Sequence, residues 1–374
     1  MAKKIFSIAF ALVFTFCFAF FGACNQPTTP PPTTPPLPDM LDARAIQNSG
    51  ARANCVWDMQ VFNNKLYIGT GDYSANSGET SIWAYDFSTE KWIEEWVAPT
   101  NAIARFKQFG NSLVALGTDP LGDWELGEYY SLTNGEWQQF RVIPNGIHNF
   151  DMAIFDGKIF AGLGVEKTNT PIVVSTDGQN FNGVTLTKNG QALDFAQEEP
   201  RVYDFIEFGG SLYAVAVIGE NSSVEVYKYN GISFDFFADW TSQLTFAQLG
   251  ENLLNGKVVF NDSIYFTSGV LYKTTDLTTL STESEISGGA VSDILVVNNK
   301  LVVLRVQKNT SGGYVNTLWI SDGDTFTELH TFEFSVPAIC MEYYGGTFFL
   351  GMGDKLNANA FNGSIVKVAY PNND

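Results

Sequence analysis

The chain has 374 residues, of which 45% are hydrophobic and 16% charged, so it can bury a core and is not disordered in composition. Its 40 acidic residues against 21 Lys and Arg give a formal net charge of −19. Such a surface repels nucleic acid, and we expect no nucleic-acid partner. The presence of only two histidines excludes a histidine-rich metal site. With 34 glycines and 14% aromatic residues, the composition favours short strands and tight turns.

The first residues have the layout of a secretory signal. Lys3 and Lys4 precede a continuous apolar run, and small residues follow it up to Cys24. The segment Phe21-Gly-Ala-Cys24 resembles the lipobox of bacterial lipoproteins, in which the cysteine becomes the lipidated first residue. The resemblance implies that residues 1–23 are a signal peptide and that Cys24 carries the lipid, with palmitate as its acyl group. An ordinary signal cut nearby, or an uncleaved membrane anchor, is the alternative.

Residues 24–40 are expected to form the lipid anchor and a linker rich in Pro and Thr. Seven of the 14 prolines lie within 25–38. Such a stretch adopts extended polyproline II, at ~3.1 Å per residue. A lipid, a stiff spacer and a globular body predict a protein of the bacterial cell envelope. Only its lipid would enter the membrane, and its body would lie on the exported side.

The rest of the chain, 41–374, repeats one unit. An apolar strand ends in a two-residue turn drawn from Asn, Asp and Gly, which tolerate the positive φ of tight hairpins, and a second apolar strand follows. The turns lie at 63–64, 110–111, 156–157, 209–210, 261–262, 298–299 and 345–346. A spacing near 47 residues with about four strands per unit is typical of a β-propeller. We therefore predict an all-β fold, a seven-bladed β-propeller with four-stranded antiparallel blades.

The two ends of the chain are predicted to close this ring. The first unit has strand patterns at 57–63, 65–70, 81–86 and 92–97, whereas the last has only three, at 338–344, 347–351 and 364–370. The last unit therefore lacks an outer strand. The segment 41–48 is free to take that place, so that an N-terminal strand closes the propeller and removes its open edges.

Two short segments of the sequence resemble known repeat families. Ile82-Trp-Ala-Tyr-Asp86 with Trp92 is similar to a kelch repeat. The segment 175–181, which runs from a Ser through Asp177 to a Phe, resembles the Asp-box turn of sialidase-like propellers. Both resemblances imply the propeller architecture. Neither implies an activity, since such propellers host unrelated functions.

One position of the repeat is rich in carboxylates. We aligned the repeats on the residue that directly follows each turn and compared the residues seven positions before it. These are Asp58, Arg105, Asp151, Asp204, Gly256, Asp293 and Cys340. In a propeller these side chains converge at the mouth of the central channel. Each Asp either accepts backbone hydrogen bonds where its strand begins, or belongs to a ring that binds a polyhydroxyl or cationic ligand, with Ca²⁺ as the ion considered. No other cofactor and no dedicated metal site are expected.

Three further residues are predicted on the same face. His148 and Arg201 both lie ten residues before the residue that follows their turn, so they should lie near Asp151 and Asp204. A histidine beside an aspartate is an acid–base pair in one interpretation and a polar loop residue in the other. Trp124 lies in an acidic loop and offers an aromatic surface suited to a sugar ring.

These features predict a surface lipoprotein, monomeric, whose propeller binds a glycan or a protein at the channel mouth. The alternative is a carbohydrate-active enzyme, a glycosidase or polysaccharide lyase, that uses the channel-mouth Asp residues and His148. A purely structural envelope protein is the third interpretation. The sequence contains no nucleophile elbow, phosphate loop or zinc motif that would name a reaction.

Cys55 and Cys340 are the two cysteines of the predicted body. They enter the inner strands of the first and last blades, which are neighbours in a closed ring, and export favours disulfides. Their positions in the repeat differ by three residues, which disfavours a bond. The pair is therefore either a disulfide across the closure or two small buried residues.

Overall fold

The computed structural model describes residues 39–41, 55–72, 78–122, 124–164, 170–219, 223–245, 255–354 and 359–371. The chain divides into two compact units, Met1–Leu37 and Pro38–Asp374, and all of the described residues belong to the second. The predicted signal peptide, Cys24 and nearly all of the predicted linker lie outside the described residues. Among the residues described, no helix is long and apolar enough to cross a membrane.

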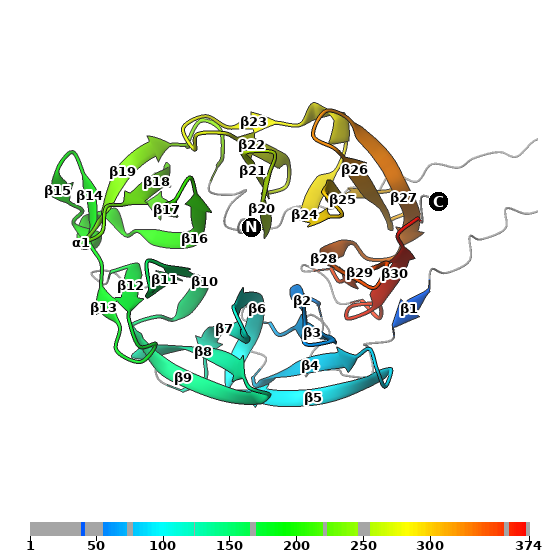
Figure 1. Cartoon of the computed structure of the whole chain (residues 1–374), viewed down its shortest axis with the longest axis horizontal. Coiled ribbons are helices and arrows are strands. Elements are labelled where there is room, and N and C mark those ends of the chain that lie inside the picture. The colour runs from blue at the N-terminus through cyan, green and yellow to red at the C-terminus, as the bar shows by residue number, and fades with distance from the viewer. Residues whose placement is uncertain are drawn as a thin grey trace, which may run out of the picture. The chain divides into compact units, whose positions relative to one another are not determined.

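The described body is built from antiparallel sheets that surround a central axis, as Figure 1 shows. In each antiparallel run of four strands, one long strand lies nearest the axis and its paired neighbours lie progressively outward. The first sheet has the order β2-β3-β4-β5. Its strands are β2 (Asp58–Phe62), β3 (Lys65–Gly69), β4 (Thr80–Asp86) and β5 (Lys91–Ala98).

The second sheet has eight strands, in two antiparallel runs of four. The first run is β6 (Thr100–Phe109), β7 (Ser112–Pro120), β8 (Leu126–Thr133) and β9 (Glu136–Pro144). The second run is β10 (His148–Phe155), β11 (Lys158–Gly164), β12 (Ile172–Ser175) and β13 (Asn182–Gly183). The runs are joined where β10 pairs with β7 at His148 and Thr118. Among the described residues this single residue pair is the only pairing between the two runs, and β6 and β10 otherwise pair with strands of their own run.

The third sheet has six strands in the order β15-β14-β19-β18-β17-β16. Its antiparallel run of four is β16 (Arg201–Phe208), β17 (Ser211–Ile218), β18 (Ser223–Tyr229) and β19 (Phe234–Asp239). A hairpin of β14 (Leu186–Lys188) and β15 (Gln191–Ala192) adds to the outer edge, with β14 parallel to β19. The short helix α1 (Phe195–Glu198) leads from this hairpin into β16 and is capped by Asp194.

Two four-stranded sheets follow. One is β20 (Asn255–Phe260), β21 (Ser263–Thr267), β22 (Leu271–Thr274) and β23 (Ser281–Thr282), followed by the 3₁₀ turn η4 (Ser284–Ile286). The other is β24 (Ala290–Val297), β25 (Lys300–Lys308), β26 (Tyr314–Ser321) and β27 (Phe326–Phe334). Both have their strands in chain order from the axis outward.

The last sheet joins the two ends of the described body. Its strands are β28 (Ala338–Tyr344), β29 (Thr347–Met352), β30 (Ile365–Ala369) and β1 (Met40–Leu41). The strand β1 pairs antiparallel with β30, Met40 opposite Val366, so an N-terminal strand occupies the outer place predicted for residues 41–48. Residues 42–48 lie outside the described part of the chain.

Tight turns and aromatic packing explain why the sequence folds this way. At the first hairpin, Asn63 and Asn64 have φ of 46° and 61°, the left-handed conformation of a type I′ turn. Buried apolar clusters lie between neighbouring sheets, and one of them joins β2 and β3 to β28, β29 and β30. There Phe87 stacks on Tyr344 with ring centroids 4.1 Å apart. The first and last sheets therefore share a core.

The segment that resembles an Asp-box forms a local turn. The Asp177 carboxylate accepts hydrogen bonds from the backbone N–H groups of Gln179 (2.9 Å) and Asn180 (2.8 Å), and from the Ser175 hydroxyl (2.8 Å). These bonds hold the pKa of Asp177 well below its ordinary value, the backbone bond from Asn180 being the largest cause. The carboxylate organises a turn at the outer end of its sheet.

Candidate functional site

A β-bulge near the start of each later inner strand sets which side chains face the axis. In the strands β6, β10, β16, β24 and β28 the register shifts one residue before the aligned position. The residue directly after the bulge is then Arg105, Asp151, Asp204, Asp293 or Cys340. A bulge changes the direction of the side chain beside it. The aligned position in the sequence repeat therefore coincides with the residue that follows the bulge in these five strands.

In β20 the bulge lies one residue later. The register shifts between Asn255 and Lys257, so Lys257, and not Gly256, follows the bulge. Gly256 has φ of 50°, and a Cβ atom there would lie 2.3 Å from the Asp293 carboxylate. Only glycine therefore fits at this close approach of β20 to β24.

Three of the predicted residues form one cluster on β6, β10 and β16. The Arg105 guanidinium lies 3.0 Å from Asp204 Oδ2 and 3.4 Å from Asp151 Oδ1. Both carboxylates are completely buried. Asp151 also accepts the backbone N–H of Phe205 at 2.9 Å, so this carboxylate joins β10 to β16 as well as pairing with a cation.

Two lysines that the sequence analysis did not single out complete the cluster. Lys107 Nζ lies 2.7 Å from Asp151 Oδ1. Lys257 Nζ lies 2.9 Å from Asp151 Oδ2, and also contacts Asp204 Oδ1 and the Phe205 carbonyl oxygen. Lys107 lies two residues after the aligned position and therefore points to the same side of its strand. Applying the alternation rule to the alignment would have found it.

Asp151 and Lys257 shift each other's pKa values. Burial alone would raise the pKa of Asp151, but Lys107, Lys257 and Arg105 outweigh it and hold that pKa far below its ordinary value. Burial lowers the pKa of Lys257, the attraction of Asp151 opposes this, and repulsion from Lys107 and Arg105 adds to the lowering. Asp151 is thus an ionised carboxylate deep in the body.

The other two predicted aspartates bind backbone. Asp58 accepts the N–H groups of Met59 at 2.9 Å and of Phe106 at 2.6 Å. Asp293 accepts those of Ile294 at 2.8 Å and Met341 at 2.7 Å. In both cases the second donor belongs to a neighbouring inner strand, Phe106 on β6 and Met341 on β28. Each carboxyl group therefore joins two sheets at the axis.

Burial raises the pKa of these two acids. It brings the pKa of Asp58 to about 6 and that of Asp293 to about 8, the latter with a further contribution from the charge of Asp58. Glu342, on β28, has its pKa raised well above the ordinary value by burial and by Asp58 and Asp293. Its side chain accepts a hydrogen bond from Gln60 on β2 at 3.1 Å. At pH 7 Asp293 and Glu342 are therefore carboxylic acids, whereas Asp58 is largely ionised.

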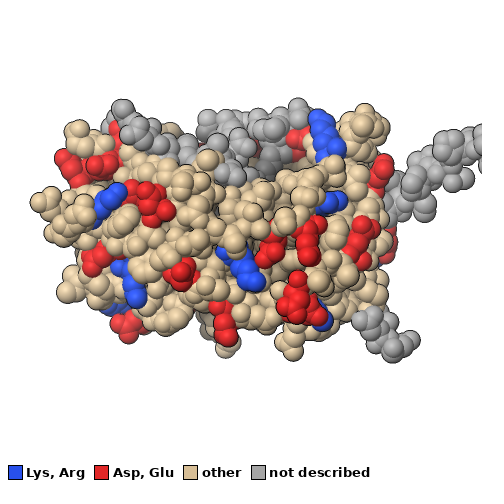
Figure 2. Space-filling view, turned by 90° about the horizontal axis from the view of Figure 1, so that it is seen from above, with Lys and Arg blue, Asp and Glu red and all other residues tan. Residues whose placement is uncertain are grey.

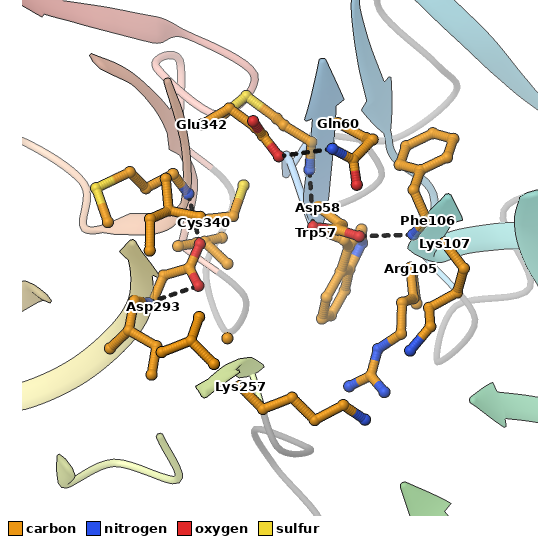
Figure 3. A pocket seen from close by; sticks show the side chains of 18 of the residues that line it. Trp57, Asp58, Gln60, Arg105, Phe106, Lys107, Lys257, Asp293, Cys340 and Glu342 are labelled. Carbon is orange, nitrogen blue, oxygen red and sulfur yellow. Dashed lines mark hydrogen bonds between the residues drawn. The ribbon is translucent and has the colours of Figure 1, made fainter. Parts of the chain in front are cut away.

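A cavity of about 380 Å³ lies along the axis between these two groups. Its lining comes from the inner strands β2, β6, β20, β24 and β28. Figure 3 shows the charged ends of Arg105, Lys107 and Lys257 close together, with Asp293 and Glu342 lying away from them. A smaller cavity of about 200 Å³ shares Lys107 and Lys257 with it.

His148, Arg201 and Trp124 lie outside this group. His148 Nδ1 is 2.7 Å from Asp119 Oδ1, and its ring lies 5.4 Å from that of Phe150. The described partners of Asp151 are the cations and Phe205 instead, so the expected pairing of His148 with Asp151 is replaced by one with Asp119. Arg201 is exposed at the start of β16. Trp124 is 52% exposed, and none of the three lines the axial cavity.

Of the two alternatives for Cys55 and Cys340, the structure contains the pair of small buried residues without a disulfide. Cys55 and Cys340 are both buried thiols. The Cys55 Sγ donates to the Asp354 carbonyl oxygen at 3.3 Å, and the Cys340 Sγ to the Val56 carbonyl oxygen at 3.5 Å. The offset of three residues in the repeat explains this, because it directs the two sulfurs to different backbone acceptors. The closure relies on strand pairing and apolar packing.

Within the described residues, no group of three or more His, Cys, Asp or Glu side chains is placed to hold a metal ion. The carboxylates of Asp58 and Asp293 accept backbone N–H groups instead, and those of Asp151 and Asp204 form ion pairs.

Comparison with known proteins establishes the fold and not the activity. No protein-family model matches the sequence, and no curated protein matches it. The chain is similar to a chain in the crystal structure of the mitotic checkpoint complex, with a TM-score of 0.53 and 10% sequence identity. The match covers 95% of this chain and 98% of that one. The fold is therefore all-β and propeller-like.

Proposed function

We propose that this chain is a lipid-anchored protein of a bacterial cell surface, whose seven-bladed propeller binds a glycan or a protein at its axial face. The observation that carries the binding proposal is the axial cavity of about 380 Å³, into which five inner strands bring charged and hydrogen-bonding side chains. Ligand sites of small molecules have volumes of about 300–1,000 Å³ with a few convergent polar groups.

The seven blades are proposed from the strand pairing. Each antiparallel run of four strands, whether alone or within a larger sheet, is taken as one blade, and β1 with β28, β29 and β30 is taken as the last. The likeness to a propeller-like chain supports this count only as architecture. An experimental electron-density map would test it, and a different number of four-stranded units around the axis would contradict it.

The anchor is proposed from the segment that ends at Cys24. We expect Cys24→Ser to abolish lipid attachment, so that the protein leaves the membrane fraction or accumulates as unprocessed precursor. Cys17→Ser is the matched control, because Cys17 lies inside the apolar run and precedes the expected cleavage site. Fractionation with mass spectrometry of the N-terminus measures both. Unchanged processing and fractionation of Cys24→Ser would overturn the anchor.

A glycan-array screen of the full chain tests the binding proposal, with capture of surface proteins in parallel. We expect saturable binding of one ligand class that Lys107→Gln weakens, since Lys107 lines the cavity. Lys300→Gln is the control, because Lys300 is exposed and pairs with Asp322 instead. Binding that neither substitution changes would move the ligand site away from the axis.

A carbohydrate-active enzyme is the second candidate, and one observation favours it. Asp58 and Asp293 line the same cavity, and burial gives them pKa values of about 6 and about 8, which suits one base and one acid near neutral pH. Their engagement with backbone N–H groups favours binding over catalysis. Release of reducing sugar from a glycan on the array, abolished by Asp293→Asn, would establish the enzyme.

A further inference from the structure

We propose that the axial cavity selects ligands that carry a carboxylate, in particular sugar acids of the hexuronate class. The inference rests on the proposed binding function and names the ligand class for it. The geometry of the cluster formed by Arg105, Lys107, Lys257, Asp151 and Asp204 carries it.

The cluster hides its negative groups and presents its positive ones. The side chains of Asp151 and Asp204 have no exposed surface, whereas those of Arg105, Lys107 and Lys257 are 11%, 21% and 22% exposed. All three cations line the cavity, and neither carboxylate does. A molecule that enters the cavity therefore meets guanidinium and ammonium groups.

The charges in the cluster do not balance when its lysines are protonated. Three cations face two carboxylates, so one positive charge is unmatched. In the absence of a ligand, burial and repulsion from Lys107 and Arg105 lower the pKa of Lys257 against the attraction of Asp151. A monoanion in the cavity would offset this repulsion. Arg and Lys bind carboxylates by charge-assisted hydrogen bonds, which are about twice as strong as neutral ones.

The surroundings of the cluster suit the rest of a sugar acid. Gln60, Asp58, Asp293 and Glu342 line the other part of the cavity. The protonated carboxyl groups of Asp293 and Glu342 can both donate to and accept from hydroxyl groups, and the Asp58 carboxylate can accept from them. The cavity, about 380 Å³, lies near the lower end of the volumes of small-molecule sites. A single sugar ring or a chain terminus fits this size better than a protein surface does.

The rest of the chain makes these cations unusual. The formal net charge is −19, and Figure 2 shows acidic side chains spread over the face that it views, with basic ones between them. An anion is therefore repelled by the molecule as a whole and attracted at the axis. This arrangement favours ligands that fill the cavity over anions that bind by long-range attraction.

The experiment compares glucuronate with glucose, which differ in one carboxylate, by isothermal titration calorimetry on the full chain in detergent. We expect glucuronate to bind at least tenfold more tightly. Lys107→Gln should weaken glucuronate at least tenfold and leave glucose unchanged, Lys107→Arg should restore most of the affinity, and Lys300→Gln should have no effect. Thermal unfolding of each variant confirms that it is folded, and the comparison in the unaltered chain stands without any variant.

Equal affinity for the two sugars, or glucuronate binding that survives Lys107→Gln, would overturn the carboxylate inference. If the array identifies a neutral glycan that binds at the axis and glucuronate does not compete with it, the binding function stands and this inference falls. If neither the array nor protein capture finds a ligand, both fall.

Discussion

The two sides of the axial cavity use the same repeat position for different chemistry. On one side Asp151 and Asp204 face three cations, and Asp151 is held ionised. On the other, Asp58 and Asp293 bind backbone N–H groups of neighbouring sheets and form no ion pair with a described residue, and their pKa values rise to about 6 and about 8. The repeat determines where an aspartate lies, and the residues of neighbouring strands determine its charge.

The sequence left two roles open for these aspartates, which were to accept backbone hydrogen bonds or to belong to a ligand-binding ring. Asp58, Asp151 and Asp293 each accept the N–H of a residue on a neighbouring inner strand, which are Phe106, Phe205 and Met341. These aspartates do accept backbone hydrogen bonds, and the bonds connect neighbouring sheets. Asp151 combines that link with ion pairs, so a backbone role and a place beside the ligand cavity are compatible.

The largest effect is expected from Asp151→Asn. It leaves three cations facing a single buried carboxylate, and breaking a buried ion pair from one side costs about 3–5 kcal/mol of unfolding free energy. Asp293→Asn is the matched change on the other side. It replaces a neutral acid by a neutral amide and forfeits one backbone bond, at about 1 kcal/mol. Urea denaturation of both variants measures the difference.

Similar losses in the two variants would contradict the comparison, because they would mean that Asp151 and Asp293 have the same charge in the native protein. Asp322→Asn serves as the exposed control, for which a change within about 0.5 kcal/mol is expected.

The second prediction concerns pH. Since the native pKa of Asp293 is about 8 against an ordinary 3.8, the native state binds this proton more tightly than the unfolded chain. The stability it contributes is complete below pH 3.8 and is lost as pH rises through about 8; for Asp58 the loss ends near pH 6. Asp151 acts in the opposite direction, because its contribution is lost as pH falls below its ordinary pKa.

Unfolding free energy should therefore decline from about pH 5 to pH 8, with a slope of at most about 1.4 kcal/mol per pH unit for each group. Asp293→Asn should flatten the part of the profile between pH 6 and pH 8. Urea titrations at pH 5, 6, 7, 8 and 9 measure it. A profile that rises over this range in the unaltered chain would mean that the acids are ionised at neutral pH.

Much of the fold was accessible from the sequence because its signals are local. The strands predicted at 57–63, 65–70, 81–86 and 92–97 correspond to β2, β3, β4 and β5, with ends that differ by one residue. The Asn, Asp and Gly turn pairs fix these hairpins through positive φ, which few other residues tolerate. The pairing of β1 with β30 followed from a missing outer strand.

The site was only partly accessible, since it depends on contacts between strands far apart in the chain. The alignment placed Arg105, Asp151 and Asp204 together, and the structure joins them. It missed Lys257 because the bulge in β20 lies one residue later than elsewhere, which no residue count reveals. It set His148 beside Asp151, yet the pairing of His148 on β10 with Thr118 on β7 brings the neighbouring Asp119 to the histidine.

The smallest effect is expected from Glu342→Gln. Burial and the charges of Asp58 and Asp293 raise the pKa of Glu342 well above its ordinary value, so the native side chain is a neutral acid of nearly the same shape as glutamine. The amide oxygen can still accept the hydrogen bond from Gln60, and we expect a change of less than about 1 kcal/mol in unfolding free energy at pH 7. Glu225→Gln is the contrasting variant, because Glu225 is buried and pairs with Lys188 at 2.7 Å, so its loss should be larger. A loss from Glu342→Gln as large as that from Asp151→Asn would mean that Glu342 is ionised, and the contrast between the ionised Asp151 and the neutral acids Asp293 and Glu342 would then fail.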